Sequence, residues 1–480
     1  MTECVLFGYE PQKLYEHFEN ISAIPRGSGN EKGIADYLCA FAETRGLAYN
    51  RDALHNVLIK KAGTTGYETH APVILQGHTD MVCEKNEDTA HDFLRDGLKL
   101  VVRDGWLYAD GTTLGADDGA AVAIMLALLE DDTAEYPPLE CMFTVQEETG
   151  MDGAYGFDYT KLAGRTLINL DSEALDVATV SCAGGVVSDL TFTLKKQPVA
   201  GTQLKLSLTG LAGGHSGADI HKGRANAVRL MGTLLARLAA QTPLRLSAIH
   251  GGNKSNAIPR ECSAWIVTDD AQTAAAQLAD IADGLKAGLC AEDSGFQISV
   301  DAAQTVPTAF SSEDTLRLLR CINDVPNGVL SYTPAAPELV EASSNLGIVR
   351  TDGETVTLTL MPRSSSEIKL DAIIGQIDAL AGELGAQVAH HDRHPGWEYA
   401  PESRIRAVYT AAYEALFDAT PKTEAIHAGL ECGIIGEKLG GIDAVSIGPD
   451  MREIHTPNEH LNLKSFADAY ALVKAMLARL

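Results

Sequence analysis

The spacing of apolar residues in the first 180 positions alternates between a helical period and short continuous runs. Apolar residues at helical spacing predict helices, and short apolar runs bounded by turn residues predict buried strands. These criteria predict helices at 9–24, 31–45 and 120–129, strands at 56–60 and 72–76, and a loop or a small hairpin around 98–108 within 84–113. The third helix is apolar nearly all round and is expected to be buried. Strands separated by helices indicate an α/β arrangement.

The pattern changes near residue 184. From 186 to 209 apolar and polar residues alternate, which is typical of an antiparallel sheet with one solvent-facing side. Further on we predict helices at 222–240, 270–289 and 366–384, and strands at 262–268, 296–301 and 354–361. From Trp397 the first pattern returns, with helices at 402–417 and 429–438, a strand at 444–447 and a terminal helix after Leu463. We therefore predict a split α/β domain, residues 1–183 and 397–480, with helices on both faces of a mixed sheet, and an inserted α+β domain, residues 184–396.

Composition limits the partners that this chain can have. At 480 residues it exceeds the size that one hydrophobic core usually serves, in agreement with two domains. A formal net charge of -27 argues against nucleic acid and anionic membranes, and it favours a site that attracts cations. The nine cysteines are scattered without zinc-ribbon spacing, which indicates reduced thiols in a cytoplasmic protein. We find no signal-peptide pattern and no apolar run long enough to span a membrane.

Acids and one histidine stand where four predicted elements begin or end. They are His78 and Asp80 after the strand at 72–76, Asp117 and Asp118 at the start of the buried helix, Glu147 and Glu148 after a β-like run, and Asp171 after the apolar run 167–170. In open α/β sheets, ligands bind at the carboxyl ends of the strands. Acids packed this closely repel one another unless a cation neutralises them. The pattern therefore predicts a polyanionic site for a cation.

Each of these motifs also fits a purely structural role. A His-x-Asp after a strand is more often a turn than a metal site, and Glu147-Glu148 fits a solvated strand end. Asp117-Asp118 fits the N-terminus of a helix, where aspartate is favoured as a cap and by the helix dipole. Both roles can hold, with Asp118 as the cap and Asp117 as the ligand.

Eight motifs spread over nearly the whole chain form a distinctive set. They are Ile21–Arg26, Gln76–Val82, Gly111–Asp117, Gln146–Gly150, Asn169–Glu173, Gly213–Gly217, Asn256–Arg260 and His427–Gly433. Together they resemble the dinuclear metallopeptidases that include aminoacylases, glutamate carboxypeptidases and carnosinase-like dipeptidases. The resemblance implies that the split domain is a catalytic domain of phosphorylase/hydrolase type and that residues 184–396 form a lid and dimerisation domain.

The resemblance also implies roles for residues of the catalytic domain. The metal ligands that it implies are His78 and Asp171 for one ion, Glu148 and His455 for the other, and Asp117 as a bridge between them. Glu147 would be the general base and Asp80 would orient His78. The cofactors would be two divalent ions, most simply Zn²⁺, with Mn²⁺ or Co²⁺ as alternatives for such ligands. A cis peptide is predicted between Asp117 and Asp118.

The substrate-binding residues implied by the resemblance are His215, Asn256, Arg363 and Gly429. His215 would stabilise the oxyanion, from its own chain or from a partner subunit, although its glycine-rich surroundings also fit a plain turn. Arg363 would bind the terminal carboxylate of the substrate, because a guanidinium can hold a carboxylate through two bonds. A surface arginine is the alternative. Gly429, with the two residues after it, would line the pocket.

The function that these features imply is that of a cytoplasmic, homodimeric metallodipeptidase. Its substrates would be small peptides, including Xaa-His dipeptides, and water activated by the metal ions would attack the peptide bond with Glu147 as base. A metal-dependent amidohydrolase acting on N-acyl amino acids is the alternative. The segment His390–His394 also looks like a metal cluster, but successive residues of a strand point to opposite faces. We therefore expect no metal there.

Overall fold

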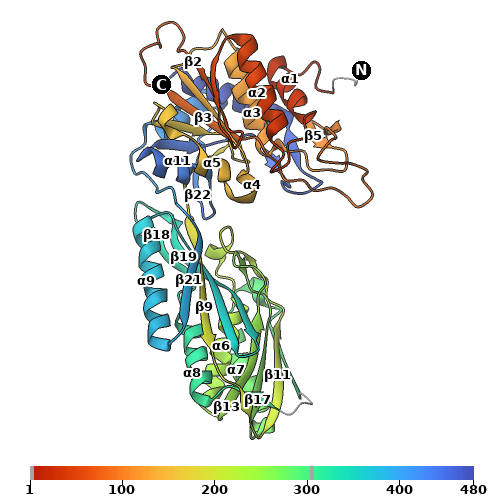
Figure 1. Cartoon of the computed structure of the whole chain (residues 1–480), viewed down its shortest axis with the longest axis vertical. Coiled ribbons are helices and arrows are strands. Elements are labelled where there is room, and N and C mark those ends of the chain that lie inside the picture. Colours follow the sequence, from red (N-terminus) through yellow and green to blue (C-terminus); the bar gives the residue numbers. More distant parts are fainter. Residues whose placement is uncertain (1–4, 303–306) are drawn as a thin grey trace. The chain divides into compact units, whose positions relative to one another are not determined.

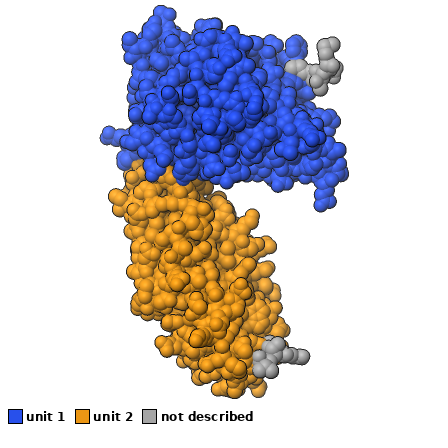
Figure 2. Space-filling view, viewed as in Figure 1, with its two compact units in different colours: residues 1–181, 400–425, 431–480 blue, residues 182–399, 426–430 orange. Residues whose placement is uncertain are grey.

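The computed structural model describes residues 5–302 and 307–480, and the chain divides into two compact units (Figures 1 and 2). Unit 1 comprises Met1–Ser181, Ala400–Ala425 and Glu431–Leu480, and unit 2 comprises Cys182–Tyr399 and Ile426–Leu430. The predicted boundaries at 183/184 and 396/397 lie near two of these divisions. The short segment Ile426–Leu430, which we had placed in the first domain, groups with unit 2.

Unit 1 is built on a mixed sheet in the order β1-β2-β6-β3-β7-β23-β8-β22, with a smaller sheet β24-β25-β5-β4. The strands are β1 Ala48–Arg51, β2 Val57–Lys61, β3 Val73–His78, β4 Leu100–Arg103, β5 Trp106–Ala109, β6 Leu139–Thr144, β7 Thr166–Asn169, β8 Val177–Cys182, β22 Lys422–Ile426, β23 Asp443–Ser446, β24 Met451–Arg452 and β25 His460–Asn462. β3 pairs in parallel with β6 and β7, and β7 pairs in parallel with β23. Every residue of β3 is buried, as expected for a strand covered on both faces.

The helices of unit 1 include one that is buried along its whole length. They are α1 Gln12–Ser22, α2 Lys32–Arg45, α3 Ala116–Glu130, α4 Glu147–Gly150, α5 Asp152–Gly156, α10 Arg404–Phe417, α11 Glu431–Leu439 and α12 Leu463–Leu477, with a 3₁₀ turn at Tyr159–Lys161. All residues of α3 from Ala116 to Leu129 are buried, and the helix packs against α1 and β3. This confirms the burial that its uniform apolar character predicted.

Unit 2 is a largely antiparallel sheet covered by helices. Its main sheet runs β16-β11-β15-β13-β19-β20-β9-β21, with β18 paired to β19. The strands are β9 Gly184–Thr193, β10 Gln197–Pro198, β11 Thr202–Thr209, β12 Gly214–His215, β13 Leu244–Gly251, β14 Ala257–Ile258, β15 Cys262–Thr268, β16 Gln297–Ala302, β17 Thr308–Ala309, β18 Gly328–Thr333, β19 Ala336–Asp352, β20 Thr355–Ser364 and β21 Gln387–His394. The helices are α6 Ala227–Ala239, α7 Ala271–Lys286, α8 Ser312–Asp324 and α9 Glu367–Leu384, with 3₁₀ turns at Ile220–Lys222 and Ala291–Asp293.

One hydrophobic core joins α6, α7, α8 and α9 to the sheet of unit 2. The alternation predicted over 186–209 is present, since Leu204, Leu206 and Leu208 of β11 are buried. The helix predicted from 222 begins five residues later, at Ala227, because the side chain of Asn226 accepts hydrogen bonds from the backbone N–H groups of the first turn and caps it. None of the helices in the described ranges is both long and apolar enough to cross a membrane.

Candidate metal centre

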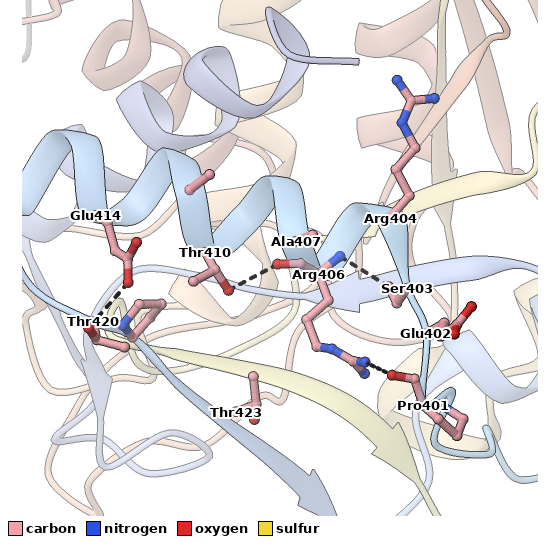
Figure 3. A pocket seen from close by; sticks show the side chains of 12 residues that line it. Pro401, Glu402, Ser403, Arg404, Arg406, Ala407, Thr410, Glu414, Thr420 and Thr423 are labelled. Atoms are coloured by element: carbon pink, nitrogen blue, oxygen red, sulfur yellow. Dashed lines mark hydrogen bonds between the residues drawn. The ribbon is translucent and has the colours of Figure 1, made fainter.

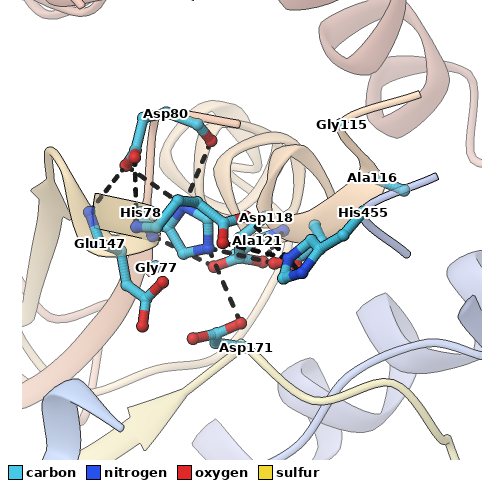
Figure 4. Close-up of polar contacts among 12 residues, drawn as sticks. Gly77, His78, Asp80, Gly115, Ala116, Asp118, Ala121, Glu147, Asp171 and His455 are labelled. Atoms are coloured by element: carbon cyan, nitrogen blue, oxygen red, sulfur yellow. Dashed lines mark hydrogen bonds and ion pairs between the residues drawn. The ribbon is translucent and has the colours of Figure 1, made fainter. Parts of the chain in front are cut away.

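Three neighbouring strands of unit 1 place the predicted ligands at one edge of the sheet. β3 lies between β6 and β7 and is parallel to both. His78 is the last residue of β3, and Asp171 follows β7 by two residues. Glu147 and Glu148 come after β6, but they begin the short helix α4 rather than ending a strand. Because parallel strands present their carboxyl ends together, the side chains of His78, Glu147 and Asp171 converge (Figure 4).

The carboxylate of Asp117 lies between two histidines. Its Oδ1 is 3.0 Å from Nε2 of His78, and its Oδ2 is 3.2 Å from Nε2 of His455. Nε2 of His455 is also 3.0 Å from Oε2 of Glu148, and Nε2 of His78 is 3.8 Å from Oδ1 of Asp171. Each histidine therefore faces one oxygen of Asp117 and one further carboxylate. This arrangement suits two cations that share one bridging carboxylate.

The electrostatics of this cluster favour a bound cation. Burial alone would lower the pKa of His78, but its hydrogen bonds to Asp117 and Asp80 hold that pKa well above the usual value. Hydrogen bonds to Asp117 and Glu148 raise the pKa of His455 to about 10. Burial and the surrounding carboxylates raise the pKa of Asp171 well above its normal range. The site therefore gathers positive charge, from protons or from metal ions.

Asp118 lies close enough to His78 and Asp171 to share an ion with them. However, both of its oxygens accept backbone hydrogen bonds, Oδ2 from the N–H of His78 at 3.1 Å and Oδ1 from the N–H of Ala121 at 3.3 Å. Asp118 thus binds the first turn of α3 and ties it to β3, whereas the oxygens of Asp117 face the two histidines. The peptide bond between Asp117 and Asp118 is cis, which confirms that prediction.

Asp80 links His78 to the two glutamates of α4. Its Oδ1 is 3.4 Å from Nδ1 of His78, and its carboxylate accepts hydrogen bonds from the backbone N–H groups of Glu147 at 3.1 Å and Glu148 at 3.3 Å. Oγ of Ser28 donates a further hydrogen bond to the carboxylate of Asp80 at 2.8 Å. Asp80 therefore fixes both a histidine ring and the start of α4. Burial and neighbouring carboxylates raise the pKa of Glu147 to about 7.

The four predicted substrate-binding residues all belong to unit 2. The short strands β12 and β14 pair His215 with Ala257, which places Asn256 one position beyond the pair. Nδ1 of His215 accepts hydrogen bonds from the backbone N–H groups of Gly217 at 3.2 Å and Ala218 at 3.1 Å. Because Nδ1 is an acceptor, the neutral ring carries its proton on Nε2. Burial and Arg363 lower the pKa of His215, which keeps the ring neutral.

Arg363 on β20 is a buried cation, with 5% of its surface exposed. In the described part of the chain no carboxylate forms an ion pair with it, its Nε has no hydrogen-bond partner, and its Nη2 contacts only Met361 Sδ at 3.7 Å. Nearby His427 bonds to Ser343 Oγ at 2.7 Å, and burial together with Arg363 lowers its pKa to about 3. Since a buried charge is costly without a partner, this environment suits an anionic ligand.

Sequence reasoning did not predict the contacts of three buried charged residues around the centre. Arg26 and Glu459 are each 2% exposed and bind the backbone next to the predicted ligands. Glu431, which we expected to line the pocket, is fully buried and accepts hydrogen bonds from Gln76 and Thr144. Burial and Glu147 raise the pKa of Glu431 to about 8. Arg26 lies inside a motif that we had singled out, so its position in the sequence was a usable signal.

Two other features of the surface contain none of the predicted site residues. His390 bonds to Ser188 at 2.9 Å and Asp378 at 3.0 Å, whereas His391 contacts Asp189 and Asp392, so the two rings have separate partners. A groove of about 910 Å³ along α10 is open, and Arg406 within it is bound to backbone carbonyl oxygens (Figure 3). The groove contains none of the predicted site residues.

Comparisons with known proteins identify the family. The model of Peptidase family M20/M25/M40 matches residues 74–479. The chain is 36% identical over 471 residues to the cytosol non-specific dipeptidase of Escherichia coli (strain K12), covering 97% of each chain. This chain therefore belongs to peptidase family M20/M25/M40, as its motifs predicted.

Solved structures agree with this assignment. The crystal structure of aminoacylhistidine dipeptidase from Vibrio alginolyticus superposes with a TM-score of 0.95 at 34% identity, covering 98% of this chain and 97% of that one. A tripeptidase from Staphylococcus aureus shares the fold, with a TM-score of 0.55 at 17% identity and 98% of both chains covered. The predicted α/β fold with an inserted α+β domain is confirmed.

Proposed function

We propose that this chain is a dinuclear metal-dependent dipeptidase. The observation that supports the proposal most directly is the carboxylate of Asp117, which offers one oxygen to His78 and the other to His455. Two further acids, Asp171 and Glu148, complete the two groups. Both relatives with more than 30% identity that we describe are named as dipeptidases.

The ligand set fits two divalent ions. Imidazole and carboxylate donors suit Zn²⁺, and also Mn²⁺ or Co²⁺. His78, Asp117 and Asp171 would hold one ion, and Asp117 with Glu148 and His455 the other. When bound, such a pair would supply Lewis acidity that lowers the pKa of water and polarises the scissile carbonyl.

The chain's own groups carry the protons and stabilise the developing charge. Glu147 takes a proton from the attacking water and delivers it to the leaving amine nitrogen, so that the C–N bond breaks after the C–O bond has formed. Asp80 holds both Glu147 and His78 in place. His215 presents an Nε2–H donor, which suits the negative oxygen of the tetrahedral intermediate.

Arg363 is proposed to bind the substrate's terminal carboxylate. Its guanidinium is buried and has no ion pair within the described ranges, so an incoming carboxylate would supply the missing partner. Asn256 and Gly429 belong to the same unit and are proposed to contact the substrate backbone. A site that binds a free carboxylate next to the scissile amide selects peptides with one residue after the cleaved bond.

A metal-reconstituted activity panel tests this function. Dipeptides, including Xaa-His, should be hydrolysed with a higher kcat/KM than the matching N-acyl amino acids. Preference for the N-acyl series would establish the amidohydrolase alternative instead. Absence of turnover for both series, with two metal ions bound, would show that the chain is a binding protein and not a hydrolase.

Metal binding is expected to release protons near neutral pH. Hydrogen bonds to Asp117 and Glu148 raise the pKa of His455 to about 10, so this ring is protonated at pH 7 before an ion binds, and the pKa of His78 is also raised by its carboxylate partners. An imidazolium cannot coordinate a metal, and therefore the metal affinity should rise with pH up to the raised pKa values. Calorimetric titration with Zn²⁺ in buffers of different ionisation enthalpy measures the protons released. Zero release at pH 7 would contradict the raised pKa values.

We also propose a cytoplasmic location and a homodimer. The relative from Escherichia coli carries the word cytosol in its name. The eight cysteines within the described ranges form no disulfide, while Cys4 lies outside those ranges. The dimer, with residues 184–396 as the lid and dimerisation domain, rests on the family resemblance of the motifs, and sedimentation equilibrium tests it directly.

A further inference from the structure

The buried carboxylate of Glu459 accepts hydrogen bonds from four consecutive backbone N–H groups, the last of which belongs to the proposed bridging ligand Asp117. Oε2 of Glu459 accepts from Leu114 at 2.7 Å and Gly115 at 2.9 Å, and Oε1 accepts from Ala116 at 2.8 Å and Asp117 at 3.2 Å. This segment leads Asp117 into the first turn of α3. An ionised carboxylate only accepts hydrogen bonds, so it can satisfy all four donors at once.

The buried guanidinium of Arg26 donates a hydrogen bond to a backbone carbonyl oxygen of the same segment. Arg26 donates from Nη2 to the carbonyl oxygen of Gly115, and from Nη1 to the carbonyl oxygens of Thr79 at 3.0 Å and Asp80 at 3.2 Å. These contacts explain the glycines that flank the aspartate pair. A Cβ at Gly115 or Gly119 would lie 2.7 or 2.6 Å from Nη2 of Arg26, so any other residue type there would force the guanidinium away from its backbone partners.

Together the two side chains connect three segments that are far apart in the sequence. Arg26 binds the backbone directly after His78, both residues bind the segment of Asp117, and Glu459 lies in the loop that carries His455. We infer that Arg26 and Glu459 are positioning residues that set the spacing of the proposed ligands His78, Asp117 and His455 without binding metal themselves. The inference rests on the proposed metal centre.

A positioning role differs measurably from a general structural one. In Glu459→Gln, one carboxylate oxygen becomes an NH₂ group that faces backbone N–H donors, so two of the four N–H groups lose their acceptor. The segment must then shift, and it moves the carboxylate of Asp117 relative to both histidines. A general structural role predicts lower stability alone, whereas a positioning role predicts weaker metal binding beyond any loss of stability.

The experiment is a titration of chelator-treated full-length protein with Zn²⁺, followed by calorimetry. For Glu459→Gln the Kd of the more weakly bound ion should rise about 10- to 100-fold relative to the wild type. With saturating Zn²⁺, kcat for a dipeptide should fall while KM changes little, because the substrate contacts in unit 2 are intact. Arg26→Lys, which keeps the charge but loses the forked geometry, should raise the same Kd.

Glu140→Gln is the matched control. Glu140 is a 3% exposed glutamate of unit 1 that accepts hydrogen bonds from the backbone N–H groups of Ala163 and Gly164 and pairs with Lys60 at 2.8 Å. Its substitution should lower the Tm of the metal-free protein about as much as Glu459→Gln does, while both metal affinities stay at the wild-type values.

Each outcome decides the inference. Wild-type Zn²⁺ affinities and kcat in a folded Glu459→Gln protein would overturn it and leave the proposed function standing. A wild-type protein that binds no divalent ion would overturn the proposed function, and the inference with it. If Glu459→Gln does not fold, Glu459→Asp decides, because the shorter carboxylate keeps its charge and must still weaken Zn²⁺ binding.

Discussion

Replacement of Glu147 by alanine is expected to lower kcat by about 100- to 10,000-fold, the usual range for loss of a general base. Both metal ions should remain bound, because five other side chains, at His78, Asp117, Glu148, Asp171 and His455, already form the two ligand groups. Metal analysis of the purified variant, combined with dipeptide kinetics at saturating Zn²⁺, measures both quantities. The combination of full metal content with a large loss of kcat is specific to a base that is not a ligand.

The physical reason lies in the position and charge of this glutamate. Asp80 fixes the backbone N–H of Glu147, which starts α4 beside the cluster. Burial and the neighbouring carboxylates raise its pKa to about 7, and a base whose pKa lies close to the working pH transfers protons most efficiently. A base must be deprotonated to act, so kcat/KM should fall as the pH drops below this pKa. Bound cations lower this raised pKa, which places the acid limb at or below pH 7.

Glu147→Gln and Glu148→Gln form a matched pair of controls. They are adjacent, and both donate a backbone N–H hydrogen bond to Asp80, but only Glu148 contacts His455. Glu147→Gln should keep both ions, whereas Glu148→Gln should lose one. The cluster geometry also permits a rival ligand group of His78, Glu147 and Glu148. Loss of an ion from the Glu147 variants would establish that group and remove Glu147 from the role of base.

The location of the candidate centre was predictable because it depends on local sequence patterns. A β-branched run followed by Gly77 and His78 marks the carboxyl end of a strand, and the apolar run before Asp171 marks another. Parallel neighbours then bring the two ends together, which is a general property of such sheets. The glycines around Asp117 also indicated a tightly packed segment, since a Cβ on either of them would clash with the guanidinium of Arg26.

The supporting residues were less predictable, because their partners are distant in the sequence. Glu459 and Arg26 are charged residues, a type that usually lies on the surface. Only the folded chain shows that backbone N–H groups 342 to 345 positions away donate hydrogen bonds to the carboxylate of Glu459. Glu431 is similar, since its partners Gln76 and Thr144 belong to other segments. Buried charges of this kind become interpretable only when their hydrogen-bond partners are known.

Elements of unit 2 were missed for two different reasons. β19 is long, and its buried stretch contains Ser343, Ser344 and Asn345, so it lacks the apolar alternation that identifies a strand. α8, by contrast, has buried Thr315, Leu318, Leu319 and Ile322 at helical spacing, and Ser311 caps it. That signal was present in the sequence and was overlooked, whereas the signal for β19 was absent.

Substitution of Arg363 is expected to weaken hydrolysis of dipeptides that have a free carboxylate, with little effect on their C-terminal amides. Truncating one partner of a buried charge pair costs about 2–5 kcal/mol, which is about 30- to 5,000-fold in kcat/KM. The amide analogue lacks the anion that Arg363 would bind, so it should already be a poor substrate and should change little. The measurement is the ratio of kcat/KM for free-acid and amide dipeptides in wild type and Arg363→Ala.

Two further variants separate a substrate anchor from a structural cation. Arg363→Met removes the charge but largely fills the space, and it should not lower the Tm of the substrate-free protein, because the described residues offer this buried cation no ion pair to lose. Arg363→Lys keeps the charge without the two-pronged geometry and should retain part of the preference for the free acid. In a dipeptide the terminal carboxylate lies one residue beyond the scissile bond. An enzyme that binds both the carboxylate and the scissile carbonyl group therefore selects substrates of that length. If the ratio of free-acid to amide kcat/KM is the same in all four proteins, Arg363 is not the anchor, and selection by length must come from elsewhere in unit 2.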